Sequence, residues 1–191
     1  TRDVVYDSLT FANRRELHLR VAQAVEALHA DRLPEFFEVL AHHYRESADR
    51  EKAITYLMRN GDRLAREYSP EAALQNYLRA IDLMRNAPQP DNRSILAAYQ
   101  RVGELALAAG RADLGFEKMR LAADLAEELG DRRALVMAVT LIGRLATKAN
   151  RFGEAQRHLT RALELSEGLT DQTLRRDILG SMGQTLARNA E

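Results

Sequence analysis

His42 and His43 are neighbours in the sequence, and paired histidines raise the question of a metal site. Imidazole nitrogens bind zinc and related metals, but three or four ligands must converge on one ion. Adjacent residues of a helix point about 100° apart, so this pair cannot face one ion without a third ligand from a distant part of the chain. His18 and His29 are eleven residues apart, about three helical turns, which is too far for them to share an ion. We therefore expect no metal site and a structural role for these histidines near the first hairpin.

Motifs of other catalytic chemistries are missing from the sequence. There is no G-x-x-x-x-G-K-[ST] phosphate loop, no G-x-G-x-x-G and no G-x-S-x-G. The run Gly180-Ser181-Met182-Gly183 has glycine at both ends and is better explained as the packing face of the last helix. Glu127-Glu128 flanks a turn, and acid–base catalysis would need a burial that the pattern does not predict. We expect no enzyme activity, no catalytic residues and no cofactor.

The composition describes a soluble helical chain without a charge bias. Hydrophobic residues make up 46% of the 191 residues and charged residues 29%, and only four are proline. Lys+Arg and Asp+Glu number 28 each, so net charge favours neither a nucleic acid nor an acidic membrane as partner. The absence of cysteine excludes disulfides, thiolate metal sites and thiol nucleophiles, and fits a cytoplasmic location.

Nothing in the sequence predicts a membrane span. The longest apolar run, 134–143, is about half of the roughly 20 residues that a spanning helix needs. The first residues, TRDVVYDSLTF, do not form a signal peptide. Because the sequence begins with Thr1, we expect it to be part of a longer polypeptide.

Helical periodicity continues along the chain, and no strand-like alternation is found. A short N-terminal segment, with Val4, Val5, Tyr6 and Leu9, precedes a break at 10–13. Asp49 and either Thr170 or Asp171 are expected N-caps, and Ser69-Pro70 a helix start. The pattern predicts nine helices, at about 14–28, 35–46, 50–67, 70–85, 93–109, 111–129, 132–149, 151–167 and 171–190.

Four glycines recur at a nearly constant interval. Gly61, Gly103, Gly143 and Gly183 are 42, 40 and 40 residues apart. Twelve residues after each of the first three glycines comes a small residue: Ala73, Gly115 or Ala155. Sixteen residues after comes a bulky one: Tyr77, Met119 or Leu159. Nineteen residues after comes an alanine: Ala80, Ala122 or Ala162. Antiparallel helices approach closely only where side chains are small, so each glycine is expected to face the second helix of its hairpin. Such hairpins bury their apolar faces by stacking.

The repeat resembles the tetratricopeptide repeat (TPR) signature. Within 136–169 the matching residues are Ile142-Gly143, Ala146, Phe152, Ala155, Leu159 and Ala162. Three features depart from it: the period is about 40 instead of 34, which also suits HEAT-type arrays; Val139 and Leu179 replace the early aromatic; and the closing proline is missing. The resemblance implies an all-α, right-handed superhelix of TPR-like antiparallel hairpins over 31–191. Its units would lie near 50–86, 93–129 and 132–168, followed by a capping helix at 171–190.

By the same resemblance, the first helix of each hairpin lines a concave groove. The lining would comprise Met58, Asp62, Arg66, Gln100, Glu104, Thr140, Arg144, Lys148, Gln184 and Arg188. Its C-terminal part is basic, which favours an acidic or polar peptide; alternatively these are ordinary exposed helix charges. Met58 and Asp62 stand where TPRs that bind chaperone tails carry their carboxylate-binding residues, so that partner is disfavoured.

A second resemblance covers residues 4–82. Tyr6-Asp7-Ser8-Leu9, Arg14-Arg15-Glu16-Leu17-His18 and Leu40-Ala41-His42-His43-Tyr44 are similar to the region after the nucleotide-binding module of bacterial STAND or AAA-type ATPase regulators. These are often fused to adenylate/guanylate cyclase or DNA-binding domains. The resemblance implies that 1–30 ends a preceding helical subdomain and that the rest is a scaffold or signal-transmitting arm. Its partner would be a protein or peptide, including neighbouring domains of the same polypeptide or a second copy. The alternative is a small-molecule sensor.

Overall fold

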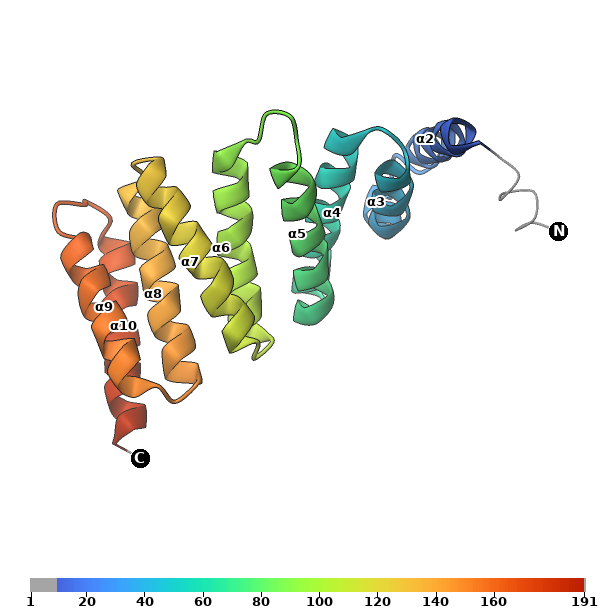
Figure 1. The fold of residues 1–191 in the computed structure, drawn as a ribbon. Coiled ribbons are helices and arrows are strands. Elements are labelled where there is room, and N and C mark those ends of the chain that lie inside the picture. Colours follow the sequence, from blue (N-terminus) through green and yellow to red (C-terminus); the bar gives the residue numbers. More distant parts are fainter. Residues whose placement is uncertain (1–9, 191) are drawn as a thin grey trace. The chain divides into compact units, whose positions relative to one another are not determined.

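The structure, a computed structural model, describes residues 10–190, and within them all regular structure is helical (Figure 1). The all-α expectation is thereby confirmed. Nine α-helices and one 3-10 helix occur in this range: α2 (Phe11–Leu28), η1 (Leu33–Phe36), α3 (Phe37–Glu46), α4 (Arg50–Arg66), α5 (Pro70–Arg85), α6 (Asn92–Ala108), α7 (Ala112–Glu128), α8 (Arg132–Lys148), α9 (Phe152–Leu165) and α10 (Gln172–Asn189). The segment from Val4 to Leu9 lies outside the described residues. Of the predicted break at 10–13 only Thr10 is non-helical: it caps α2 by accepting from Asn13 N–H at 3.3 Å, so this helix begins at Phe11 instead of Arg14.

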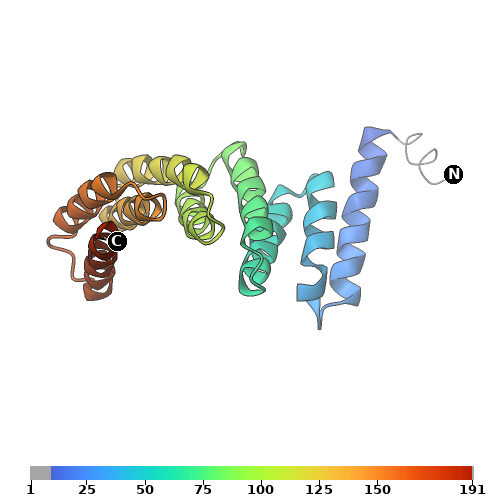
Figure 2. The same ribbon diagram turned by 90° about the horizontal axis from the view of Figure 1, so that it is seen from below.

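The chain divides into two compact units, Thr1–Pro88 and Gln89–Glu191, and in each the helices pack against their neighbours in the sequence. In the first unit, α2 lies beside α3, α3 beside α4, and α4 forms an antiparallel hairpin with α5 (Figures 1 and 2). The second unit contains the hairpins α6–α7 and α8–α9, followed by α10. No described helix is both long and apolar enough to cross a bilayer.

Helix α8 is the centre of the second unit. It packs on α7 and α9 and also contacts α6 and α10. Twelve of its 17 residues are buried. A helix enclosed in this way keeps only a narrow strip of surface for solvent.

Aspartate caps α4, α6, α8 and α10 at the same interval as the glycines. The caps are Asp49, Asp91, Asp131 and Asp171. Their carboxylates accept from the backbone N–H of Lys52 at 3.0 Å, Ser94 at 3.3 Å, Ala134 at 2.9 Å and Leu174 at 3.0 Å. An N-cap satisfies a backbone donor that the helix itself leaves unpaired. Ser69 makes no capping hydrogen bond, although Pro70 begins α5 as expected.

The glycine register is confirmed in three hairpins. A Cβ on Gly61 would lie 2.7 Å from Tyr77 Cε2, one on Gly103 would lie 2.5 Å from Met119 Sδ, and one on Gly143 would lie 2.6 Å from Leu159 Cγ. In each case the bulky residue at +16 is in contact, and a Cβ on Gly103 would in addition meet Leu141 of α8. The helices are therefore too close for any side chain at these positions.

The fourth glycine differs. A Cβ on Gly180 or Gly183 would meet nothing within 4 Å. The interpretation of this run as a packing face is therefore wrong. In α10 the residues that pack are instead Leu174, Ile178 and Thr185, all buried.

The turn after the first helix of each hairpin needs a left-handed residue. Tyr68, Gly110 and Asn150 occupy equivalent positions, with φ of 56°, 69° and 58°. The next residue donates its N–H back to a helical carbonyl, as from Ser69 to Leu64 at 2.9 Å. Glycine adopts this conformation without strain, whereas a side chain with a Cβ does not.

Replacing Tyr68 by glycine should therefore stabilise the protein. Tyr68 is 94% exposed, so its side chain has little packing to lose, and the strain relieved is about 1 kcal/mol. Urea denaturation followed by circular dichroism measures the change. Gly110→Tyr should have the opposite effect, and a Tyr68→Gly protein less stable than the wild type would contradict the prediction.

Candidate functional site

Of the ten residues predicted to line a groove, Met58 lies on α4 and is half-buried. The other nine also lie on the first helices of hairpins or on α10. Asp62 and Arg66 belong to α4 in the first unit, and the other seven belong to the second unit. The seven are Gln100 and Glu104 on α6, Thr140, Arg144 and Lys148 on α8, and Gln184 and Arg188 on α10. Of the nine, Arg66, Glu104, Arg144, Lys148 and Gln184 are exposed.

Three of the nine, Asp62, Thr140 and Arg188, make contacts that stabilise the fold. Asp62 accepts a hydrogen bond from the Tyr77 hydroxyl at 2.7 Å, across the α4–α5 hairpin. Thr140 is 6% exposed and donates to the Val136 carbonyl at 2.7 Å, so its side chain cannot line an open groove. The expectation for Thr140 is wrong because α8 is enclosed by its neighbours on nearly every side.

Arg188 ties α10 to the end of α8. Its guanidinium donates to the Thr147 carbonyl at 3.2 Å and to Asn150 Oδ1 at 2.9 Å. Thr147 and Thr185 also share a buried hydrogen bond of 2.7 Å between the same two helices. The role of Arg188 is therefore at least partly structural.

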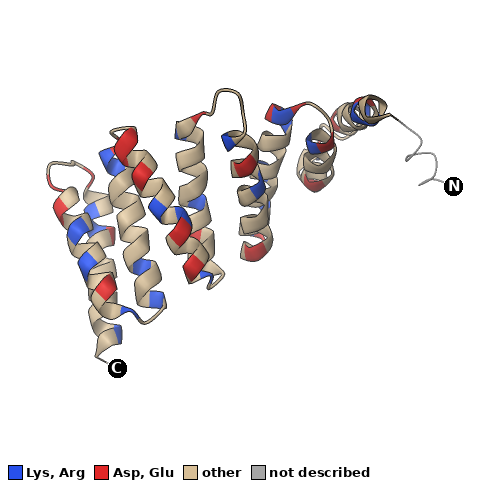
Figure 3. Cartoon of the chain, viewed as in Figure 1, with Lys and Arg blue, Asp and Glu red and all other residues tan. Residues whose placement is uncertain are grey.

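Arg144 and Lys148 are the predicted residues best placed to bind something. They lie four residues apart, on one face of α8, and both are exposed. Neither makes a hydrogen bond or ion pair with another described residue. All the exposed residues of α8 are basic, and the helix contains no acidic residue, whereas α7 carries both signs (Figure 3). Two unpaired cations on a rigid, otherwise buried helix suit an acidic partner.

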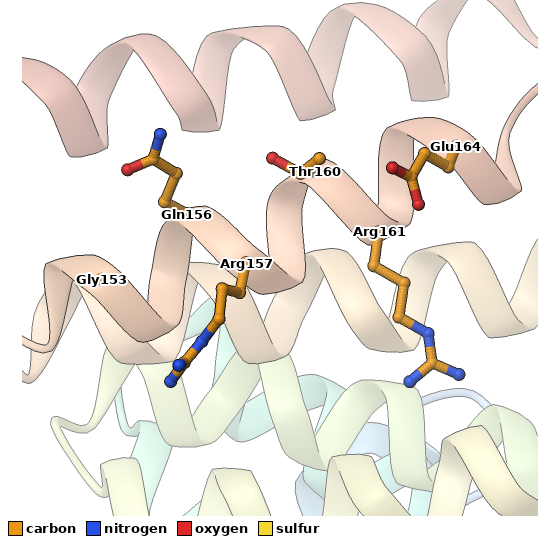
Figure 4. A pocket seen from close by; sticks show the side chains of 6 residues that line it. All are labelled: Gly153, Gln156, Arg157, Thr160, Arg161 and Glu164. Atoms are coloured by element: carbon orange, nitrogen blue, oxygen red, sulfur yellow. The ribbon is translucent and has the colours of Figure 1, made fainter.

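The surface hollows of the second unit are shallow. One, of about 360 Å³, is lined by six residues of α9 alone (Figure 4): Gly153, Gln156, Arg157, Thr160, Arg161 and Glu164. In Figure 4, Arg157 and Arg161 point to one side of α9, and Gln156 and Thr160 to the other. Groups that diverge from one helix cannot enclose a small ligand.

A second hollow, of about 540 Å³, is lined by several elements of the same unit. Arg93 and Gln100 of α6, Arg132 and Arg133 of α8, and Leu169 after α9 border it. Arg132 donates to the Leu165 carbonyl at 2.8 Å, and Arg133 forms an ion pair with Asp171 at 2.9 Å. The hollow is thus lined by three arginines and one aspartate, Asp131, and two of the three arginines already have partners.

In the first unit the structure brings together three histidines. His18 of α2 lies beside His42 and His43 of α3, and one nitrogen from each is within 4.8 Å of the others. The sequence interpretation missed this group because it compared His18 only with His29. The signal was available: His18 and His43 are equally far from the turn at about residue 30, so an antiparallel hairpin places them face to face.

The electrostatics of this cluster favour neutral imidazoles. His18 Nδ1 and His43 Nδ1 are 2.8 Å apart, so one ring donates its N–H and the other accepts. Burial lowers the pKa of both rings below the ordinary 6.5, and neighbouring imidazoles lower it further, while Glu46 acts in the opposite direction. Neutral imidazole is the form that binds metal.

A second polar group of the first unit joins three helices. The Glu26 carboxylate accepts from the Tyr44 hydroxyl at 2.5 Å, from the Tyr56 hydroxyl, and from Lys52 Nζ at 2.6 Å. Burial alone would raise the pKa of Glu26, but these hydrogen bonds outweigh it and lower the pKa. Burial and the same carboxylate raise the pKa of Tyr56 to about 12. This group ties α2 to α3 and α4, and its role is structural.

Comparison with solved structures supports the fold. A crystal structure of BtubC (BKLC) from P. vanneervenii is similar to this chain, with a TM-score of 0.57 and 14% sequence identity. The similarity covers 96% of this chain and 68% of that one. No protein-family model and no curated protein matches the sequence. At this identity the likeness concerns the arrangement of helices alone.

Proposed function

We propose that this chain is a non-catalytic protein-interaction region, a scaffold or signal-transmitting repeat module within a larger regulator of the ATPase or nucleotide-cyclase type. The observation that supports a binding role is the pair Arg144 and Lys148. Both are exposed, unpaired within the described chain, and fixed on a helix with twelve buried residues. A cation on such a helix loses little backbone freedom when a partner binds.

The partner that fits this surface is an acidic or polar protein segment. Opposite charge across an interface accelerates association and excludes partners of the same charge. The link to an ATPase or cyclase regulator rests on the resemblance at 14–18 and 40–44, and it makes neighbouring domains of the same polypeptide the first partners to test.

Reversing both charges, in Arg144→Glu with Lys148→Glu, should weaken binding by roughly tenfold or more, because attraction becomes repulsion. The probe is the purified remainder of the polypeptide, labelled and titrated with this chain at two salt concentrations. Binding by the wild type should weaken as salt rises, since screening acts on exposed charges. Circular dichroism should show an unchanged fold.

The matched control is the double variant Arg157→Glu with Arg161→Glu. This pair has the same spacing and the same change in charge, is exposed, and lies on α9 of the same hairpin. Arg161 forms an exposed ion pair with Glu127 at 3.5 Å, a kind of pair that contributes only about 0–1 kcal/mol to folding. The control variant should bind normally. If both double variants weaken binding equally, the change in net charge alone explains the effect. Normal binding by the α8 variant would refute the proposed surface.

A small-molecule sensor is the second candidate, and the 540 Å³ hollow favours it. Its arginines would suit an anionic metabolite. A specific ligand should raise the unfolding temperature, because it binds only the folded chain. Loss of that shift in Arg93→Gln, with retention in the α8 double variant, would support the sensor over the scaffold.

A further inference from the structure

The three histidines of the first unit form the one group in residues 10–190 with at least three side chains able to hold a metal ion. They come from two helices that pack against each other, α2 and α3. Their ring centroids are 5.7 Å apart for His18 and His42, 5.0 Å for His18 and His43, and 5.1 Å for His42 and His43. Each ring therefore neighbours both of the others.

The spacing is close to what a metal ion needs. Zinc–nitrogen bonds are about 2.0–2.1 Å long, which places the nitrogens of a tetrahedral site about 3.3 Å apart. The nitrogens here lie within 4.8 Å of one another. Only a small shift of the rings would bring these nitrogens to the separation of a tetrahedral site. His42 can provide much of that shift by rotating its side chain, because it is exposed.

The two adjacent residues of α3 can share an ion because His18 lies close to both of them. Side chains at 42 and 43 diverge by about 100° around the helix axis. His18 comes from the facing helix and closes the gap, as its 2.8 Å contact with His43 shows. The third ligand that the sequence argument required is thus supplied by α2.

The helix end beside the cluster favours a cation. His43 lies in the last turn of α3, where the helix dipole is negative. The Glu46 carboxylate, one turn after His42, forms an ion pair with Arg45 at 2.9 Å, so these two residues together add little net charge beside the cluster.

The ligand chemistry selects the class of metal. Imidazole suits zinc, copper, nickel and cobalt, whereas magnesium and calcium prefer oxygen ligands. Because His42 is exposed, the site has an open side from which an ion can enter and at which water can complete the coordination. Ligands from two helices mean that the ion would fasten one helix to the other.

We propose that His18, His42 and His43 bind one divalent transition-metal ion of the zinc class, with water as the fourth ligand, and that this ion clamps α2 to α3. The proposal concerns the first unit and is independent of the surface on α8.

Titration of the chelator-treated, untagged chain with ZnCl2 in a calorimeter tests it. The expected result is one ion per chain, with an affinity reduced by at least about tenfold in His42→Gln. Zinc should raise the unfolding temperature of the wild type and leave that of His42→Gln nearly unchanged. His42 is exposed, so this variant should fold like the wild type, which circular dichroism verifies.

The chain contains five histidines, and the other two provide matched controls. His29→Gln and His158→Gln should bind zinc like the wild type, whereas His18→Gln should be impaired like His42→Gln. Cobalt should give the visible absorption of a four-coordinate site in the wild type, and magnesium should not compete. No saturable binding of one ion per chain, or unchanged binding by His42→Gln, would overturn the proposal.

Discussion

Replacing Gly143 by leucine should lower the free energy of unfolding of the second unit by roughly 1–3 kcal/mol. A Cβ at this position would lie 2.6 Å from Leu159 Cγ and 3.4 Å from the Ala155 carbonyl oxygen. Leu159 is completely buried, so it has no free space into which to move. The two helices of the hairpin must therefore separate, and the contacts between them are lost.

Urea denaturation followed by far-UV circular dichroism measures this effect. The control is Gly183→Leu, at the equivalent position of α10, where a Cβ would meet nothing within 4 Å. Leucine is a better helix former than glycine by about 1 kcal/mol, so the control should be neutral or slightly stabilising. Similar destabilisation by the two variants would contradict the assigned contact.

Replacing Glu26 by alanine should destabilise the first unit by about 2–4 kcal/mol. Tyr44 and Tyr56, both nearly fully buried, would lose the carboxylate that accepts from their hydroxyls. Leaving a buried donor without its partner costs about 1–3 kcal/mol. The ion pair with Lys52 would disappear as well.

Glu16→Ala is the control for this variant. Glu16 lies on the same helix and forms an exposed ion pair with Arg20 at 2.8 Å. Pairs of this kind contribute about 0–1 kcal/mol. Chemical denaturation of the two variants should therefore give clearly different losses, and equal losses would mean that the Glu26 group is not a structural tie.

The Glu26 group also predicts a dependence on pH. Its folded pKa lies below the ordinary value of 4.5, so the folded state binds the proton less readily than the unfolded state. Its contribution is therefore fully present above pH 4.5 and is lost as the pH falls through the folded pKa. The stability difference between wild type and Glu26→Gln should shrink over that range, and a difference that grows on acidification would refute the assignment.

Local sequence signals were sufficient for the helices and for their register. Caps and turn residues form hydrogen bonds with backbone groups only a few residues away in the sequence. The helix predicted at 50–67 is therefore observed as Arg50–Arg66, and the one predicted at 93–109 as Asn92–Ala108. The glycine–bulky pairing joins residues only sixteen apart, across one turn. It could therefore be predicted from spacing alone, as Gly143 and Leu159 illustrate.

Contacts beyond one hairpin could not be predicted in this way. Thr140 is buried because α8 contacts α6 and α10 in addition to its own hairpin partner. The repeat pattern assigns one exposed face to the first helix of every hairpin, so it cannot predict burial by helices outside the hairpin. Arg188 looked like an exposed charge, yet it bonds a carbonyl 41 residues earlier.

The candidate metal site was missed for a related reason. The approach of His18 to His43 depends on how α2 packs on α3, and each histidine considered within its own helix gives no indication of it. The two exposed cations of α8, by contrast, were predicted, because basic residues four apart on a mostly apolar helix are visible in the sequence.

The common interval of the capping aspartates, contact glycines and left-handed turn residues has a consequence for how such a chain can change during evolution. The segment from Asp91 to Asp131 carries its own start signal, its own close helix contact and its own turn residue, Gly110. Duplication or loss of a whole interval would leave each of these in phase with its partner. An insertion of any other length within a helix would rotate the glycine away from the neighbouring helix by about 100° per residue. The chain can therefore change its length readily in steps of about 40 residues and only with difficulty in smaller ones.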